Sequence, residues 1–97
     1  MRLRYTRRAL ADLDGILDYI ASQSPQGATR VHARIQRMVS LLPSHPAIGS
    51  RTEDPTIRKL ATPPYPYLIF YEPTEKEVIV HAIRHAARNP SDTPGSG

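Results

Sequence analysis

Two spacings of apolar residues divide the first part of the chain into a short strand and a helix. Arg2–Tyr5 alternates apolar and polar residues, which predicts a strand. Thr6 follows as a favourable N-cap, and apolar residues then recur at helical spacing over Arg7–Ser22. This apolar stripe consists of Leu10, Leu13, Ile16, Leu17 and Ile20. Gly15 weakens the helix by up to about 1 kcal/mol relative to alanine, and its lack of a side chain allows another backbone to approach closely.

A second amphipathic helix is predicted over Gln26–Leu42, after a break with Pro25 and Gly27 as its breakers. Two such helices joined by a short break favour an antiparallel hairpin. The apolar stripe of the second helix consists of Ala28, Val31, Ile35, Met38, Val39 and Leu42. A different face carries the basic residues Arg30, Arg34 and Arg37.

The period of the apolar residues changes to two near residue 57, which predicts strands. Pro43–Thr56 has no periodicity and is expected to be a surface connection. Strands are predicted over Ile57–Ala61, Tyr67–Glu72 and Glu77–His85, and the short EPTEK link favours antiparallel pairing of the last two. The order β-α-α-β-β-β predicts an α+β fold. In it, the antiparallel helical hairpin packs on one face of a small, mainly antiparallel sheet and leaves the other face available.

Length and composition limit the class of protein. The 97 residues fit one small domain, expected over residues 1–89, and residues 90–97 are expected to be a disordered tail rich in Pro, Gly and Ser. The chain has no cysteine, which excludes disulfides and thiolate metal sites. No apolar run approaches the roughly 20 residues of a membrane span, so we expect a cytoplasmic protein. The net charge of +4 fits a nucleic-acid footprint, a complement to an acidic protein, or a solvated basic surface, and charge alone does not choose among them.

An ordered set of short segments resembles the RelE/ParE superfamily of bacterial toxins. The resemblance runs from about Leu3 to Asn89, and its spacing is closer to the ParE branch than to the RelE branch. The segments are ALADLDGILDYIA at Ala9–Ala21, SPQGA at Ser24–Ala28, LLPSHPAIG at Leu41–Gly49, IRKL at Ile57–Leu60, YPYLIFY at Tyr65–Tyr71 and HAAR at His85–Arg88.

The resemblance implies a toxin of a type II toxin–antitoxin system. In the ParE branch it implies inhibition of DNA gyrase, and neutralisation by a ParD-like antitoxin of the ribbon-helix-helix type in a hetero-oligomer. No sequence-specific DNA binding by the toxin itself and no membrane role are expected. One alternative is a RelE-like, ribosome-dependent mRNA endonuclease. The other is a degenerate toxin that only binds its antitoxin and takes part in transcriptional autoregulation.

A nuclease of this superfamily needs a base, an acid and cations around one phosphate. The weak catalytic candidates are Arg58, His85 and Arg88. RelE-like nucleases tend to carry an arginine where Leu68 stands and basic residues where Ala86 and Ala87 stand. We therefore expect a binding protein rather than an enzyme, with no cofactor and no metal site. If the chain is an enzyme, a metal-independent endoribonuclease is expected.

The basic and aromatic residues are also candidates for contacts with the target or with the antitoxin. A basic rim suits an amphipathic, partly acidic tail that folds on binding. The candidates are Arg30, Arg34, Arg37, Arg58, Tyr67, Tyr71, Arg84, His85 and Arg88. Each type also has a structural alternative: a solvated helix face for the helical arginines, an edge-strand charge for Arg58, and core packing for the tyrosines.

The period of the last strand decides which of its polar side chains share a face. A period of two puts His81 and His85 on one face and Arg84 on the other, unless a bulge near Ala82 changes the alternation. His81 lies among apolar strand residues, so a hydrogen-bonded role in the sheet is expected for it.

Overall fold

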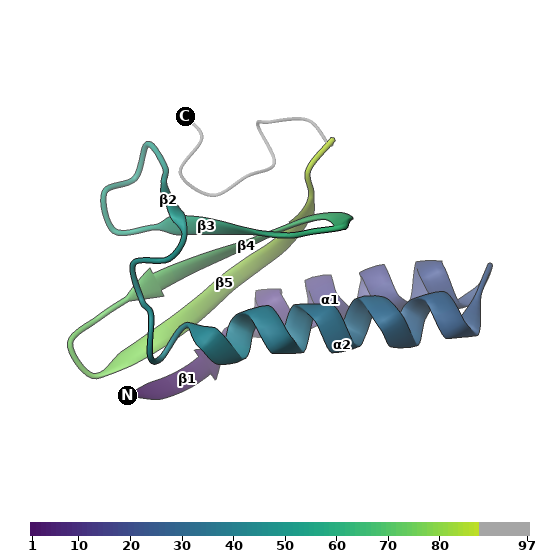
Figure 1. The fold of residues 1–97 in the computed structure, drawn as a ribbon, viewed down its shortest axis with the longest axis horizontal. Coiled ribbons are helices and arrows are strands. Elements are labelled where there is room, and N and C mark those ends of the chain that lie inside the picture. Colours follow the sequence, from purple (N-terminus) through teal and green to yellow (C-terminus); the bar gives the residue numbers. More distant parts are fainter. Residues whose placement is uncertain (88–97) are drawn as a thin grey trace.

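A computed structural model describes residues 1–87 of the chain. The elements within this part are β1 (Arg2–Tyr5), α1 (Arg7–Ala21), α2 (Pro25–Leu41), β2 (Ser50–Arg51), β3 (Arg58–Thr62), β4 (Tyr65–Pro73) and β5 (Glu77–His85). The helices form a hairpin on one face of a five-stranded sheet (Figure 1). The predicted α+β fold is therefore confirmed. Arg88 and the predicted tail at residues 90–97 lie outside the described residues.

The sheet is mainly antiparallel, as predicted. Its strand order is β1-β5-β4-β3-β2, in which β1 and β5 are parallel and the other neighbours are antiparallel. The pairing of β1 with β5 ends at Tyr5 and Val80, where the chain turns into α1. The rest of β5, from His81 to His85, pairs with β4 on one side and has no strand on the other, and α1 makes extensive contacts with β5.

Helix α1 begins at Arg7 as predicted, and α2 begins at Pro25, one residue before the predicted start; each has a side-chain cap. The Thr6 hydroxyl accepts a hydrogen bond from the Ala9 N–H (3.1 Å) and donates one to the His81 carbonyl (3.2 Å). The Ser24 hydroxyl accepts from the Gly27 N–H at 3.0 Å, and Pro25 occupies the first turn, where its missing N–H is harmless. Thr6 thus fixes the start of α1 directly against β5.

Strand β2 is absent from the sequence prediction, which placed a structureless connection over Pro43–Thr56. Ser50 pairs with Lys59, and Arg51 pairs with Arg58. A strand of two exposed polar residues leaves no alternation of apolar and polar positions, so the pattern could not reveal it. Strand β4 also begins earlier than predicted, at Tyr65.

The two faces of the sheet carry separate apolar clusters. The larger cluster joins the helices to strand residues Leu60, Tyr67, Ile69, Tyr71, Val78, Val80 and Ile83. The opposite face carries Ile57, Phe70 and Ala82, all buried, with Leu68 packed against them. The face expected to be available is thus partly apolar and buried, and β4 and β5 contribute to both clusters as central strands do.

Neither α1 nor α2, among the described residues, has the length and apolar character required to cross a bilayer.

Candidate functional site

A cavity of about 340 Å³ lies between α1 and the ends of β4 and β5. We call it the α1–β5 cavity. It brings together two predicted candidates on β5 and one on β4 with side chains of α1. The residues that matter for its chemistry are Asp12, Gly15, Tyr19, Tyr67, Arg84 and His85.

Asp12 anchors α1 to the part of β5 that lies beyond the end of β1 and is paired only with β4. One carboxylate oxygen accepts the Ile83 N–H at 3.1 Å, and the other accepts Arg84 Nη1 at 3.2 Å. Asp12 thus satisfies a backbone donor that would otherwise lack a partner, and it positions the Arg84 guanidinium. The two side chains are only 14% and 22% exposed.

Burial raises the pKa of the Asp12 carboxyl above its ordinary value of 3.8, although the hydrogen bond from Ile83 and the charge of Arg8 act in the opposite direction. The buried Arg84 Nε has no hydrogen-bond partner within the described residues. Asp12 therefore holds the Arg84 guanidinium at the wall of the cavity through Nη1, while Nε stays buried.

His85 is held at the mouth of the same cavity by two contacts. Its ring meets the ring of Tyr67 edge to face, with centroids 5.5 Å apart and planes at 85°. Its Nδ1 accepts the Ala87 N–H at 3.1 Å, so the neutral imidazole carries its proton on Nε2. This geometry orients His85 as a fixed hydrogen-bond donor.

The wall formed by α1 is open at Gly15. A Cβ added to Gly15 would meet no atom within 4 Å, so the close backbone approach considered for this glycine does not occur within residues 1–87. Tyr19, one turn further along α1, is 67% exposed. The cavity therefore has an exposed aromatic rim and free space over the helix backbone.

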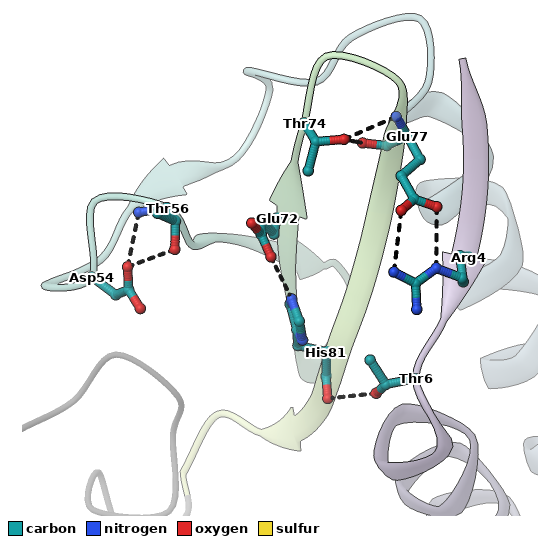
Figure 2. A network of polar contacts seen from close by, with 8 residues as sticks. All are labelled: Arg4, Thr6, Asp54, Thr56, Glu72, Thr74, Glu77 and His81. Atoms are coloured by element: carbon teal, nitrogen blue, oxygen red, sulfur yellow. Dashed lines mark hydrogen bonds and ion pairs between the residues drawn. The ribbon is translucent and has the colours of Figure 1, made fainter.

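His81 is a bulged residue, so the alternative of a bulge near Ala82 holds and the regular alternation that would place His81 beside His85 does not. Tyr71 pairs with Val80 and Phe70 pairs with Ala82, so the register shifts across His81. His81 Nε2 lies 2.9 Å from Glu72 Oε1, and Figure 2 shows the two side chains pointing toward one another from β5 and β4. His85 contacts Tyr67 on the helix side, so His81 and His85 do not act together. The predicted hydrogen-bonded sheet role of His81 is confirmed.

Arg84 and His85 both line the α1–β5 cavity although they are consecutive residues of one strand. Arg84 pairs with Leu68 and His85 pairs with Tyr67, so their backbones alternate as predicted. The Arg84 side chain nevertheless reaches Asp12 on α1, and both side chains line the α1–β5 cavity.

Arg58 and Tyr71 hold the connection between α2 and β2. Arg58 Nη1 donates to the Gly49 carbonyl at 2.7 Å. The Tyr71 hydroxyl accepts from the Gly49 N–H and donates to the Pro46 carbonyl, both at 2.9 Å. Tyr71 is 0% exposed, which places it in the core. Arg58 pairs with Arg51 and Tyr71, so the edge-strand interpretation of Arg58 is wrong.

The catalytic candidates Arg58 and His85 do not converge. Arg58 is opposite Tyr71 and His85 is opposite Tyr67, which are four residues, or roughly 13 Å, apart along β4. Side chains at this separation, one of them bonded to loop carbonyls, do not surround one phosphate. The third candidate, Arg88, lies outside the described residues.

Comparison with known proteins identifies the family. Residues 3–90 match the family described as the ParE toxin of the type II toxin–antitoxin system, parDE. The chain belongs to the ParE toxin family. A ParE-family chain of this kind is the toxin component of a type II toxin–antitoxin system.

Two relatives of this ParE-family toxin cover most of its length. Toxin RelE2 of Caulobacter vibrioides is 42% identical over 84 residues, which are 87% of this chain and 93% of the relative. A solved chain of the chromosomal ParDE TA system from P. aeruginosa superposes with a TM-score of 0.74 at 28% identity, covering 88% of this chain and 95% of that one.

The predicted arginines of the ParE-family chain's second helix lie apart from the α1–β5 cavity. Arg30, Arg34 and Arg37 line a separate hollow beside the β3–β4 turn, and the two hollows share no lining residue. Arg30 and Arg37 are exposed, and Arg34 is partly buried.

Sequence reasoning missed the contribution of α1 to the cavity of this ParE-family toxin. Asp12, Gly15 and Tyr19 follow one another at spacings of three and four, which places them on one helical face beside the apolar stripe. The available signal was this combination of a carboxylate, a glycine and a tyrosine on one face of a helix that was predicted to cover a sheet.

Proposed function

We propose that this ParE-family toxin acts by binding and inhibiting DNA gyrase, and that a ParD-like antitoxin of the ribbon-helix-helix type neutralises it in a hetero-oligomer. The family match to the toxin of the parDE system supports the proposal. The observation that carries it is the α1–β5 cavity. Arg84, His85 and Tyr67 line it from the sheet, and Tyr19 lines it from α1. Arginine and aromatic side chains around a hollow are typical anchors of protein–protein interfaces.

The chemistry of the described residues supports binding over catalysis. Arg58 and His85 lie at different places along β4, and His81 is bonded to Glu72 on another part of the sheet. In the cavity, the Arg84 guanidinium is paired with Asp12 and the His85 ring is fixed against Tyr67. Such preorganised groups suit recognition of a partner surface.

The test is inhibition of plasmid supercoiling by purified gyrase. Wild-type toxin is expected to inhibit supercoiling, and His85→Ala combined with Arg84→Gln is expected to raise the inhibitory concentration about tenfold or more, because interface anchors carry most of the binding energy. His45→Ala is the matched control, since His45 is an exposed loop residue. Unchanged supercoiling with wild-type toxin would refute the gyrase proposal.

A ribosome-dependent mRNA endonuclease is the second candidate. Arg84, His85 and Asp12 in one cavity supply a cation, an imidazole and a carboxylic acid whose pKa burial has raised. Discrete cleavage within codons, seen by primer extension on translated message in cells expressing the toxin, would favour this candidate. Absence of a growth defect without the antitoxin would instead favour a degenerate toxin that serves antitoxin binding and autoregulation.

A further inference from the structure

Three arginines of α2 form a cationic strip that we call the α2 arginine row: Arg30, Arg34 and Arg37. Their spacings of four and three residues put them on one face of the helix. They line a hollow of about 480 Å³ together with Ala33, Pro64 and Tyr65. Arg37 follows Arg30 by seven positions, or roughly 10 Å along the helix axis.

Within residues 1–87, no acidic side chain pairs with this row. Helix α2 contains no aspartate or glutamate, and the ion pairs among residues 1–87 involve Arg4, His81 and Arg84 instead. Arg34 Nε donates to the Pro63 carbonyl at 2.7 Å, which fixes this side chain without neutralising it. Like charges at helical spacing repel one another. A negatively charged partner would reduce this repulsion, so binding of such a partner is favoured.

The lining of the hollow indicates that a ligand must also present an apolar side chain. Tyr65 and Pro64 form one wall, and the small side chain of Ala33 leaves room between Arg30 and Arg37. A ligand that fits therefore presents carboxylates to the arginines and an apolar side chain to Tyr65. This combination describes an amphipathic acidic peptide segment with two or three carboxylates within roughly 10 Å.

A nucleic acid fits the row less well. The row is short enough that few phosphates could reach it at once. Helix α1 packs against α2 and exposes Asp14 and Asp18, which would oppose a phosphate backbone laid across the hairpin. The charges on the two helices thus favour a short acidic segment.

We propose that the α2 arginine row docks an acidic, amphipathic segment of the antitoxin, at a surface separate from the α1–β5 cavity. The inference rests on the proposed neutralisation by an antitoxin and deepens it. It assigns neutralisation to α2 and the β3–β4 turn, and it assigns target binding to α1 and the end of β5. The two hollows share no lining residue, so changes in one leave the side chains of the other in place.

The test measures binding of the product of the open reading frame adjacent to this chain's own. Isothermal titration calorimetry compares wild-type toxin with Arg30→Glu combined with Arg37→Glu, because both side chains are exposed and make no ion pair within residues 1–87. The double variant is expected to lose about tenfold or more in affinity, because each reversal replaces attraction by repulsion. Arg7→Glu combined with Arg51→Glu makes the same charge change at exposed positions outside the row and is expected to lose less than about threefold.

A charge exchange distinguishes direct contact from a structural effect. Lysine in place of acidic residues in the toxin-bound segment of the adjacent-frame product is expected to restore affinity for the double variant. Thermal unfolding followed by circular dichroism verifies that both double variants fold, and affinity is compared only between folded proteins.

The outcomes separate this inference from the proposed function. If wild-type toxin does not bind the adjacent-frame product, neutralisation by that product fails, and the inference fails with it. If wild type and the row variant bind it equally, the inference is overturned while neutralisation stands. Loss of binding to a short DNA duplex, or loss of a dimer in light scattering, with unchanged binding of the adjacent-frame product, would also overturn it.

Discussion

At the residue scale, the arginines of this toxin differ in whether their guanidinium groups have a bonded partner within residues 1–87. Arg4 forms a two-pronged bond to Glu77, with both contacts at 3.1 Å (Figure 2). Arg84 is paired with Asp12, and Arg58 is bonded to loop carbonyls. Arg30 and Arg37 have no such partner within residues 1–87. The bonded arginines stabilise the fold, whereas Arg30 and Arg37 remain available to bind a partner.

The Tyr71 hydroxyl provides the sharpest test of a structural role. Tyr71→Phe removes the acceptor of the buried Gly49 N–H and the donor to the Pro46 carbonyl. The free energy of unfolding is expected to fall by about 1–3 kcal/mol, because a buried donor is left without a partner. Urea denaturation measures it. Tyr5→Phe is the control, since the half-buried Tyr5 hydroxyl makes no hydrogen bond within the described residues, and an equal loss in both variants would contradict this role.

The buried carboxyl of Asp12 predicts a pH dependence of stability. Burial raises its folded-state pKa above 3.8, so the folded protein holds this proton more tightly than the unfolded chain does. The contribution of Asp12 to stability is therefore greatest below pH 3.8 and falls as the pH rises through the folded pKa. Asp12→Asn keeps an oxygen to accept the Ile83 N–H and removes the titration.

Urea denaturation from pH 3 to pH 7 compares these two proteins. The stability of wild type minus that of Asp12→Asn is expected to decline as the pH increases from about 3.8 and then to level off. A difference that grows with pH would mean that Arg84 lowers the pKa of Asp12 more than burial raises it.

At the element scale, two glycines in different elements predict opposite effects of the same substitution. A Cβ on Gly15 of α1 would meet nothing within 4 Å, so Gly15→Ala is expected to stabilise the protein by about 0.5–1 kcal/mol. A Cβ on Gly49 would lie 2.6 Å from the Lys59 carbonyl oxygen and 2.8 Å from the Tyr71 hydroxyl, so Gly49→Ala is expected to cost about 1–3 kcal/mol. Thermal and urea unfolding measure both, and equal effects would contradict the packing described.

The elements also show which features the sequence can and cannot predict. The Thr6 cap, the breakers Pro25 and Gly27 and the helical stripes locate α1 and α2 to within a residue or so, because these signals are local. Strand β2 and the bulge at His81 depend on pairing partners far along the chain. The alternation of apolar residues does not depend on such partners, so it could not decide whether His81 shares a face with His85 or lies in a bulge near Ala82; the strand pairing shows the bulge.

At the scale of the whole molecule, the helical hairpin separates two hollows. The α1–β5 cavity is lined by α1, β4 and β5, and the α2 arginine row lies on α2 beside the β3–β4 turn. The sequence singled out Arg84, His85 and Tyr67 as basic and aromatic candidates, whereas Asp12 and Tyr19 join the cavity only through the docking of α1 on β5. The strand residues of the candidate site could therefore be predicted from the sequence, whereas its α1 residues depend on tertiary packing.

The central claim is that the target binds in the α1–β5 cavity, and a dose–response of gyrase supercoiling tests it most directly. Gly15→Gln extends a side chain into the cavity without removing any existing contact, whereas Asp14→Gln changes an exposed neighbour that does not line it. Wild type and Asp14→Gln are expected to inhibit equally, and Gly15→Gln about tenfold or more weakly. Full inhibition by folded Gly15→Gln would contradict the account.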